Sequence, residues 1–308
     1  MEIALQFVLL ALGFVMLGKG ADWFVEGAAG IAMRFGIPQL VIGLTIVAMG
    51  TSAPEAAVSI AAAVKGNADI TIGNIVGSNI LNILVILGLA ASIVPIAVAR
   101  STVRIEIPFM IGVTALLFYQ GRDGSISLAD GGVLMVAFAV YMMYLYTMAM
   151  KSNVDSDLEE PGLPLGRCLL GAVGGLALII AGSNVTVGAA TSIATYAGLS
   201  ERFIGLTIVA LGTSLPELFT SVAAARRGNA DIAIGNIVGS NIFNILFVVG
   251  LSSLIIDIPF ASVFNFDTYV ALGAAVLLWL CVLRTQRLQR WAGALMLVCY
   301  AAYLGYIL

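Results

Sequence analysis

Two glutamates of this chain lie in matching motifs within apolar sequence. Residues 50–55 read Gly-Thr-Ser-Ala-Pro-Glu, and residues 212–217 read Gly-Thr-Ser-Leu-Pro-Glu. A charge near the centre of a membrane helix costs about 2.5 to 3.5 kcal/mol, and neither Glu55 nor Glu217 has a Lys or Arg close by in sequence. Each carboxylate therefore needs a mobile counter-ion or a proton, and the pair predicts a cation site.

The same motifs also fit a structural role at a helix start. Ser52 with Glu55, and Ser214 with Glu217, match the S-x-x-E capping box. A cap contributes only about 1 kcal/mol, which is less than the cost of placing the charge in lipid. We therefore expect capping to be a secondary role of these glutamates.

The proline before each glutamate breaks its helix. Proline has no N–H, and its ring crowds the carbonyl four residues earlier, which here belongs to Gly50 or Gly212. A free carbonyl at membrane depth is tolerated where a cavity, water or an ion satisfies it. The two breaks therefore predict backbone oxygen ligands beside the carboxylates.

A second motif, G-N-I-V-G-S-N-I-x-N, occurs at residues 73–82 and 235–244. In each copy a serine and an asparagine are four residues apart, which places both on one helix face as neutral oxygen ligands. These residues are Ser78, Asn82, Ser240 and Asn244. The other asparagines are expected to bond neighbouring helices, and the G-x-x-x-G glycines to permit close helix packing. These asparagines are Asn74, Asn79, Asn236 and Asn241.

The combined ligands are carboxylate, hydroxyl, amide and carbonyl oxygens, and the chain contains no histidine. Such a set suits a hard cation, and Ca2+ accepts six to eight oxygens in adaptable geometry. Two glutamates balance one divalent ion or two or more monovalent ions. This charge balance favours exchange of Ca2+ for Na+, with both as transported ions and no other cofactor.

Both motifs belong to a segment that occurs twice. Residues 43–89 recur as residues 205–251 with 13 differences in 47 positions. The chain is 61% hydrophobic and 10% charged, and its apolar runs reach the roughly 20 residues needed to span a bilayer. We predict an all-α integral membrane protein with ten transmembrane helices, in two inverted repeats of five, with helices 2, 3, 7 and 8 broken. The helices are expected at residues 3–33, 38–64, 70–95, 104–119, 126–150, 166–196, 203–225, 232–256, 266–283 and 290–308.

Basic residues predict the orientation and the division of the chain. Loops after the odd-numbered helices hold ten Lys or Arg residues and the opposite loops hold three, and cytoplasmic loops are the richer in these residues. We expect a multi-pass protein of the cell membrane with both termini extracellular or periplasmic. Residues 1–150 and 166–308 would form the two repeats, joined by a cytoplasmic linker at 151–165.

Together, these motifs resemble the α-repeats of the Na+/Ca2+ exchanger family within the cation/Ca2+ antiporters, over essentially the whole chain. The resemblance implies Na+ entry driving Ca2+ export by alternating access, with helices 1 and 6 as a sliding pair. It implies ligands from carboxylates, hydroxyls, amides and two backbone carbonyls: Glu55, Glu217, Thr51, Ser52, Thr213, Ser214, Ser78, Asn82, Ser240, Asn244, Ala48 and Ala210. Many exchangers have Asp where this chain has Asn244, which leaves the Na+ stoichiometry and any H+ or K+ coupling open.

Other function classes are weighed against this one. An H+-coupled or K+-dependent antiporter is the nearest alternative, and a cation channel could use the same broken helices. An enzyme is disfavoured because the chain has no histidine for a catalytic triad and no G-x-x-x-x-G-K-[ST] nucleotide loop. There is no basic tract for nucleic acid. We expect a monomer whose partners are the lipid bilayer and the transported ions.

Overall fold

A computed structural model describes residues 2–66, 68–151, 163–198 and 210–307. The first half contains α1 (Glu2–Arg34), α2 (Gln39–Ile42), η1 (Gly43–Val47), α3 (Ala48–Thr51), α4 (Ala53–Val64), α5 (Asp69–Leu81), η2 (Asn82–Leu87), α6 (Gly88–Ile93), β1 (Ile96–Ala97), η3 (Thr102–Glu106), α7 (Ile107–Gln120), η4 (Gly121–Asp123), β2 (Ser125–Ile126) and α8 (Leu128–Lys151). The second half contains α9 (Leu165–Tyr196), α11 (Ala210–Thr213), α12 (Leu215–Arg226), α13 (Ala230–Phe243), η6 (Asn244–Val249), α14 (Gly250–Ile255), β3 (Ile258–Pro259), α15 (Val263–Leu283), β4 (Arg287–Leu288) and α16 (Arg290–Ile307).

The protein is helical, as predicted, and most helix ends lie within a few residues of the expected positions. Within the described ranges, eight helices are long and apolar enough to cross a membrane, and one bent pair makes a ninth. The helix expected at 203–225 begins outside the described residues, which include its later part as α11 and α12. Most of the linker expected at 151–165 also lies outside them. The count of ten helices stays a prediction.

Two of the four predicted breaks occur, and two do not. The segment at 39–64 bends by 51° between Thr51 and Ala53, and a similar interruption at Ser214 separates α11 from α12. The prediction of breaks in helices 3 and 8 is wrong, because Ile70–Ile93 and Ala230–Ile255 are each one continuous helix.

Helices 3 and 8 change their winding instead of breaking. Each contains a π-helical stretch, η2 or η6, that begins at Asn82 or Asn244. These segments have no proline, so nothing forces the chain to leave the helix. A π-helical turn admits an extra residue per turn and is frequent at functional sites, and here it begins at the predicted ligand.

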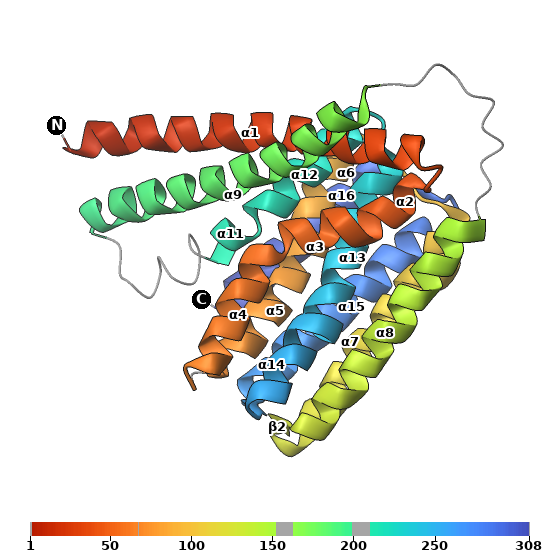
Figure 1. Cartoon of the computed structure of the whole chain (residues 1–308). Helices are drawn as coiled ribbons and strands as arrows, with labels where there is room; N and C mark the ends of the chain where they lie inside the picture. The colour runs from red at the N-terminus through yellow and green to blue at the C-terminus, as the bar shows by residue number, and fades with distance from the viewer. Residues whose placement is uncertain (1, 67, 152–162, 199–209, 308) are drawn as a thin grey trace.

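The long helices α1 and α9 lie side by side across one end of the molecule, at an angle to α7, α8, α13 and α15 (Figure 1). Glycines bring the two backbones together. A Cβ on Gly27 would lie 2.4 Å from the Ala172 nitrogen, and one on Gly175 would lie 2.5 Å from the Phe24 nitrogen. Small residues at such a crossing permit close packing without interlocked side chains.

The two copies of the repeat contact each other reciprocally through short strands. Ile96 in β1 pairs with Leu288 in β4, and Ile126 in β2 pairs with Ile258 in β3. Ile96 and Ile258 are 162 positions apart, as are Ile126 and Leu288, which is also the offset between the motifs. The two strand pairs are therefore equivalent to each other, because each joins the first of these positions in one copy to the second in the other copy.

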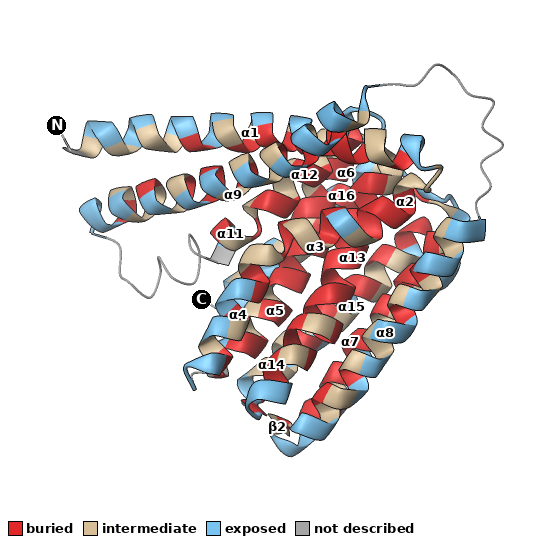
Figure 2. Cartoon of the chain, viewed as in Figure 1, coloured by how far each residue is buried: buried red, intermediate tan, exposed pale blue. Residues whose placement is uncertain are grey.

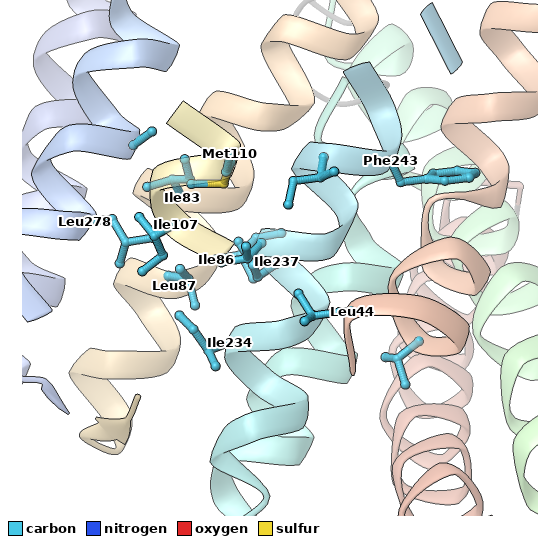
Figure 3. Packing of buried hydrophobic residues seen from close by; sticks show 14 of the residues in the cluster. Leu44, Ile83, Ile86, Leu87, Ile107, Met110, Ile234, Ile237, Phe243 and Leu278 are labelled. Carbon is cyan, nitrogen blue, oxygen red and sulfur yellow. The ribbon is translucent and has the colours of Figure 1, made fainter. Parts of the chain in front are cut away.

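The interior is built around α5, η2, α13 and η6. Every residue from Ile232 to Phe243 is buried, whereas the outer faces of α1, α8 and α9 carry exposed apolar side chains such as Phe7, Val136 and Leu170 (Figure 2). Figure 3 shows side chains of η2, α7, α13 and α15 gathered in one cluster. An apolar outer surface over a packed interior is the arrangement expected of a protein in lipid.

Candidate cation site

The two motif glutamates are buried at equivalent helix starts. Glu55 is the third residue of α4 and Glu217 the third residue of α12, and each follows the proline at the second position. Proline is tolerated there because its missing N–H has no helical partner to lose. Both glutamates are 1% exposed, so bulk solvent does not reach them.

The serine of each motif donates a hydrogen bond to the glutamate of the other repeat copy. Ser52 Oγ donates to Glu217 Oε1 at 2.8 Å, and Ser214 Oγ donates to Glu55 Oε1 at 3.3 Å. Both serines occupy N-cap positions, but neither hydroxyl makes a capping hydrogen bond. The capping-box role is therefore wrong, and the hydroxyls instead hold the carboxyl group of the other copy.

Thr51, Ala48 and Ser240 meet beside these carboxyl groups. The Thr51 hydroxyl lies 3.0 Å from Asn236 Oδ1 and 3.3 Å from the Ala48 carbonyl oxygen, either of which can accept its proton. Ser240 Oγ donates to the same carbonyl at 3.4 Å. Three of the predicted ligands, from both repeat copies, thus lie at one place.

The carbonyl freed by the second break has a protein partner. Ser183 Oγ of α9 donates to the Gly212 carbonyl oxygen at 2.7 Å. A carbonyl oxygen has two lone pairs, so this bond uses one of them, and the expectation that the oxygen is a ligand stays a prediction. The bond also ties α9 to the break in the motif.

Four asparagines form a reciprocal network between α5 and α13. Asn79 Nδ2 donates to the Asn241 carbonyl oxygen, and Asn241 Nδ2 donates to the Asn79 carbonyl oxygen, each at 3.2 Å. Asn82 Nδ2 donates to Asn241 Oδ1 at 2.9 Å, and Asn244 Nδ2 donates to Asn79 Oδ1 at 3.1 Å. Asn79 and Asn241 bond a neighbouring helix, as predicted, and they fix the amide groups of the two candidate ligands.

Asn74 and Asn236 also bond neighbouring helices as predicted. Asn74 Nδ2 donates to Ser59 Oγ, and Asn236 Nδ2 donates to Ser221 Oγ, each at 2.9 Å. Each amide also donates to the backbone carbonyl of the motif glutamate, Glu55 or Glu217. These asparagines therefore position the helix turns that carry the carboxyl groups.

Four buried oxygens of the predicted site have no hydrogen-bond partner. They are Glu55 Oε2, Glu217 Oε2, Asn82 Oδ1 and Asn244 Oδ1. Buried polar atoms are nearly always paired, and all four of these atoms act as acceptors when the carboxyl groups are ionised. The described residues contain no cluster of three or more His, Cys, Asp or Glu side chains, so the donors are two carboxylates and neutral oxygens. This set suits a hard cation.

The remaining predicted ligands, Ser78, Thr213 and Ala210, are the repeat equivalents of Ser240, Thr51 and Ala48. Ser78 is 3% exposed on α5, Thr213 ends α11, and Ala210 is the first described residue of that helix. Asp22 and Glu26 of α1 lie elsewhere, because they pair with Arg227 at 3.2 and 3.1 Å. They form a surface ion pair with another helix turn and stand apart from the predicted ligands.

Removing the hydroxyl of either motif serine should weaken cation binding. We expect Ser52→Ala and Ser214→Ala each to raise the Kd for Ca2+ by roughly 10- to 100-fold, because a hydrogen bond to a charged group contributes about 1.5 to 3 kcal/mol. Isothermal titration of the purified protein measures the change. Ser192→Ala is the matched control, because Ser192 is exposed on α9 and its hydroxyl bonds its own helix. Unchanged affinity in both site variants would contradict the role of the serines.

Comparison with known proteins places this geometry in a family. A family model described as sodium/calcium exchanger protein matches residues 5–147 and 168–308. The chain belongs to the sodium/calcium exchanger family. It is 40% identical to the putative antiporter CaxA of Alkalimonas amylolytica and 33% identical to the sodium/calcium exchanger MaX1 of Methanosarcina acetivorans, in both cases over 98% of each chain.

A solved exchanger has the same fold. The structure of the sodium-calcium exchanger NCX_Mj aligns with a TM-score of 0.86 and 34% identity, over 98% of this chain and 99% of that one. The inner membrane protein YrbG of Escherichia coli is 40% identical over 80% of this chain and 79% of its own length. The resemblance inferred from the motifs is confirmed: this exchanger is a multi-pass helical membrane protein of the cation/Ca2+ antiport class. Of its relatives, CaxA is named a putative antiporter and MaX1 a sodium/calcium exchanger.

Proposed function

We propose that this exchanger carries Na+ and Ca2+ in opposite directions, and that both ions compete for one site built on Glu55 and Glu217. The observation that carries the proposal is the pair of buried carboxyl groups. Each accepts a hydrogen bond from a serine of the other repeat copy, and each keeps one oxygen without a partner. Two repeat copies thus contribute one carboxylate each to a single cluster.

The ligand set proposed for this site combines charged and neutral oxygens. It comprises Glu55, Glu217, Thr51, Ser52, Thr213, Ser214, Ser78, Asn82, Ser240, Asn244, Ala48 and Ala210. Ca2+ needs six to eight oxygens, which this set can supply. Asn244 contributes an amide in place of a third carboxylate, so the protein charge at the site is −2 when both glutamates are ionised.

Charge balance supports coupling of the two ions. One Ca2+ or two Na+ would neutralise the two carboxylates, whereas an empty site would bury two uncompensated charges at high cost. If the protein changes its facing state only when the site is neutralised, it must carry Ca2+ in one direction and Na+ in the other. Differential stability of loaded and empty states is what converts binding into a conformational preference.

We propose that α1 and α9 move as a pair to switch access between the two sides. The pair meets through glycine backbones, and no residue of α1 from Ile3 to Leu12 is buried. In the remaining helices, reciprocal hydrogen bonds between the repeat copies hold the carboxyl groups and the asparagine amides. A pair of outer helices, α1 and α9, beside helices that are hydrogen-bonded to each other is suited to alternating access around a fixed site.

The orientation proposed for the membrane places both termini outside the cytoplasm, with repeats at 1–150 and 166–308 inverted relative to each other. Alkaline phosphatase fused after the last residue should be active in this orientation, since that enzyme matures outside the cytoplasm. A green fluorescent protein fused at the same place that glows normally would contradict it. Light scattering of the detergent-purified protein tests the proposed monomer.

Ion fluxes in liposomes test the proposed exchange. Vesicles loaded with Na+ and diluted into Na+-free buffer should accumulate radioactive Ca2+, and vesicles without a Na+ gradient should not. Uptake driven by a pH gradient in the absence of Na+ would replace Na+ with H+ as the coupled ion, and a requirement for K+ would add that ion. Equal uptake with and without every gradient would show a channel and overturn antiport.

A further inference from the structure

A third buried acid, Glu106, lies away from the candidate cation site. It is the last residue of η3, within the candidate span Thr102–Asp123, and it is 0% exposed. The Tyr144 hydroxyl of α8 donates to Glu106 Oε1. A carboxylate buried without a charge partner is costly, and the candidate cation site makes no use of Glu106.

The surroundings of Glu106 contain further unpaired oxygens. Glu106 Oε2, Thr102 Oγ1 and Tyr141 Oη are buried without a hydrogen-bond partner. Thr102 precedes Glu106 by about one helix turn, and Tyr141 precedes Tyr144 by one turn of α8, so both pairs share a helix face. The Tyr141 ring is held by stacking on Phe109 at 5.4 Å, and the next turn of α8 carries Tyr144, which bonds Glu106.

No cationic side chain in the described part of the chain forms an ion pair with this acid. Among the described residues, the ion pairs join Arg227 to Asp22 and Glu26, and Glu106 is in none. The packed elements η3, α7, α8 and α15 carry four other charged side chains, and none of them pairs with Glu106. They are Arg104, Asp130, Lys151 and Asp267. A lone buried carboxylate needs a charge partner, and hydroxyl groups alone do not provide one.

The second repeat copy shows that the fold does not require an acid here. The equivalent residue, 162 positions later, is Thr268, whose hydroxyl donates to the Phe264 carbonyl oxygen at 2.7 Å. Tyr303 is equivalent to Tyr141, and its hydroxyl donates to Asp267 Oδ1 at 2.9 Å. Asp267 is only half-buried. The second copy is therefore satisfied internally, whereas the first copy leaves three oxygens unpaired around an acid.

We propose that Glu106, Thr102 and Tyr141 form a second binding site that holds one singly charged cation, either H+ or Na+. One carboxylate balances one positive charge. The Glu106 carboxylate can take up a proton, and the two unpaired hydroxyl oxygens can accept a hydrogen bond from the resulting acid. Alternatively, all three oxygens can ligate Na+. Ca2+ is disfavoured because a single carboxylate leaves half its charge uncompensated and few oxygens to surround it. The proposal is independent of exchange at Glu55 and Glu217.

The test uses the full chain with the central carboxylates removed. In purified E55Q/E217Q protein, equilibrium dialysis with radioactive Na+ should detect one saturable ion per chain if Na+ is the ligand. In Na+-free buffer, infrared spectroscopy should detect the C=O stretch of a protonated carboxylic acid if the ligand is H+. Adding Glu106→Gln should remove whichever signal is present. Adding Asp267→Asn, the matched control from the second copy, should leave it.

Thr102→Val provides a second test in case the Glu106→Gln variant does not fold. It keeps the carboxyl group of Glu106 and removes one unpaired oxygen of the proposed site. It should weaken Na+ binding at least tenfold, or shift the infrared band without removing it. The E55Q/E217Q protein keeps Glu106, Thr102 and Tyr141, so its Na+ binding and infrared band report on the unmodified second site. Absence of both residual Na+ binding and a carboxylic-acid band assigned to Glu106 would overturn the proposal.

Discussion

Glutamine in place of Glu55 or Glu217 is expected to reduce Na+-driven Ca2+ uptake by about 100-fold or more. The substitution keeps the size of the side chain and removes one of two negative charges, so the remaining carboxylate cannot balance a divalent ion. A carboxylate and a bound Ca2+ form a buried pair of opposite charges, and removing one partner of such a pair costs about 3 to 5 kcal/mol. This cost is a factor of roughly 100 to several thousand in affinity. Radioactive Ca2+ uptake by Na+-loaded liposomes measures the loss.

Asp123→Asn is the control for this experiment, because Asp123 is exposed in η4 and its charge faces solvent. Its uptake should equal that of the unmodified protein. Normal uptake by either glutamine variant would contradict a site that needs both carboxylates. Because each glutamate is held by a serine of the other copy, the two variants should fail to similar extents.

Alanine at Gly239 is expected to disrupt the protein, whereas alanine at the equivalent Gly77 is expected to be tolerated. A Cβ on Gly239 would lie 2.8 Å from the Ala48 Cβ and from two backbone atoms of Leu44, so α13 would have to move away from η1 and α3. Overpacking of this kind costs about 1 to 3 kcal/mol. The shift would also move the Ala48 carbonyl, a proposed ligand, so Ca2+ uptake should fall about tenfold or more.

Gly77 provides the matched control within the same chain, since a Cβ there would meet no atom within 4 Å. Thermal unfolding of the two alanine variants, followed by uptake in liposomes, separates stability from transport. Gly77→Ala should match the unmodified protein in both. Equal behaviour of the two variants would mean that the close approach of α13 to η1 has no energetic role.

Much of the fold could be predicted because lipid imposes simple rules on the sequence. An apolar run of sufficient length specifies a helix, and most helix ends lie close to their expected positions. The errors arise where two influences compete. Glycine-rich helices 3 and 8 were expected to break, but without proline they remain continuous and change to π-helical winding at Asn82 and Asn244. The G-x-x-x-G prediction holds at Gly235, which meets the Gly43 backbone, and is wrong at Gly77.

The sequence indicates which polar residues are candidates for the site, but it does not indicate the hydrogen bonds between them. Glu55, Glu217, Asn82 and Asn244 were identified from polar residues in apolar helices, and the structure leaves an oxygen of each unpaired in the interior. The hydrogen bonds from the serine of one copy to the glutamate of the other could not be predicted, because local spacing favours the capping box within one copy. Glu106 was missed, although a charge inside an apolar span is the same signal that identified the other glutamates.

The lengths of α1 and α9 have a consequence for the surrounding lipid. They contain 33 and 32 residues, or about 50 Å of helix, whereas the hydrocarbon core of a bilayer is about 30 Å thick. Such helices must tilt steeply or extend into the headgroups, while α15, with 21 residues, can stand nearly upright. If the pair moves as proposed, each position matches a different bilayer thickness. The length of the lipid acyl chains would then change the free-energy difference between the two positions. The rate of transport would depend on the lipid even though the lipid does not contact the ions.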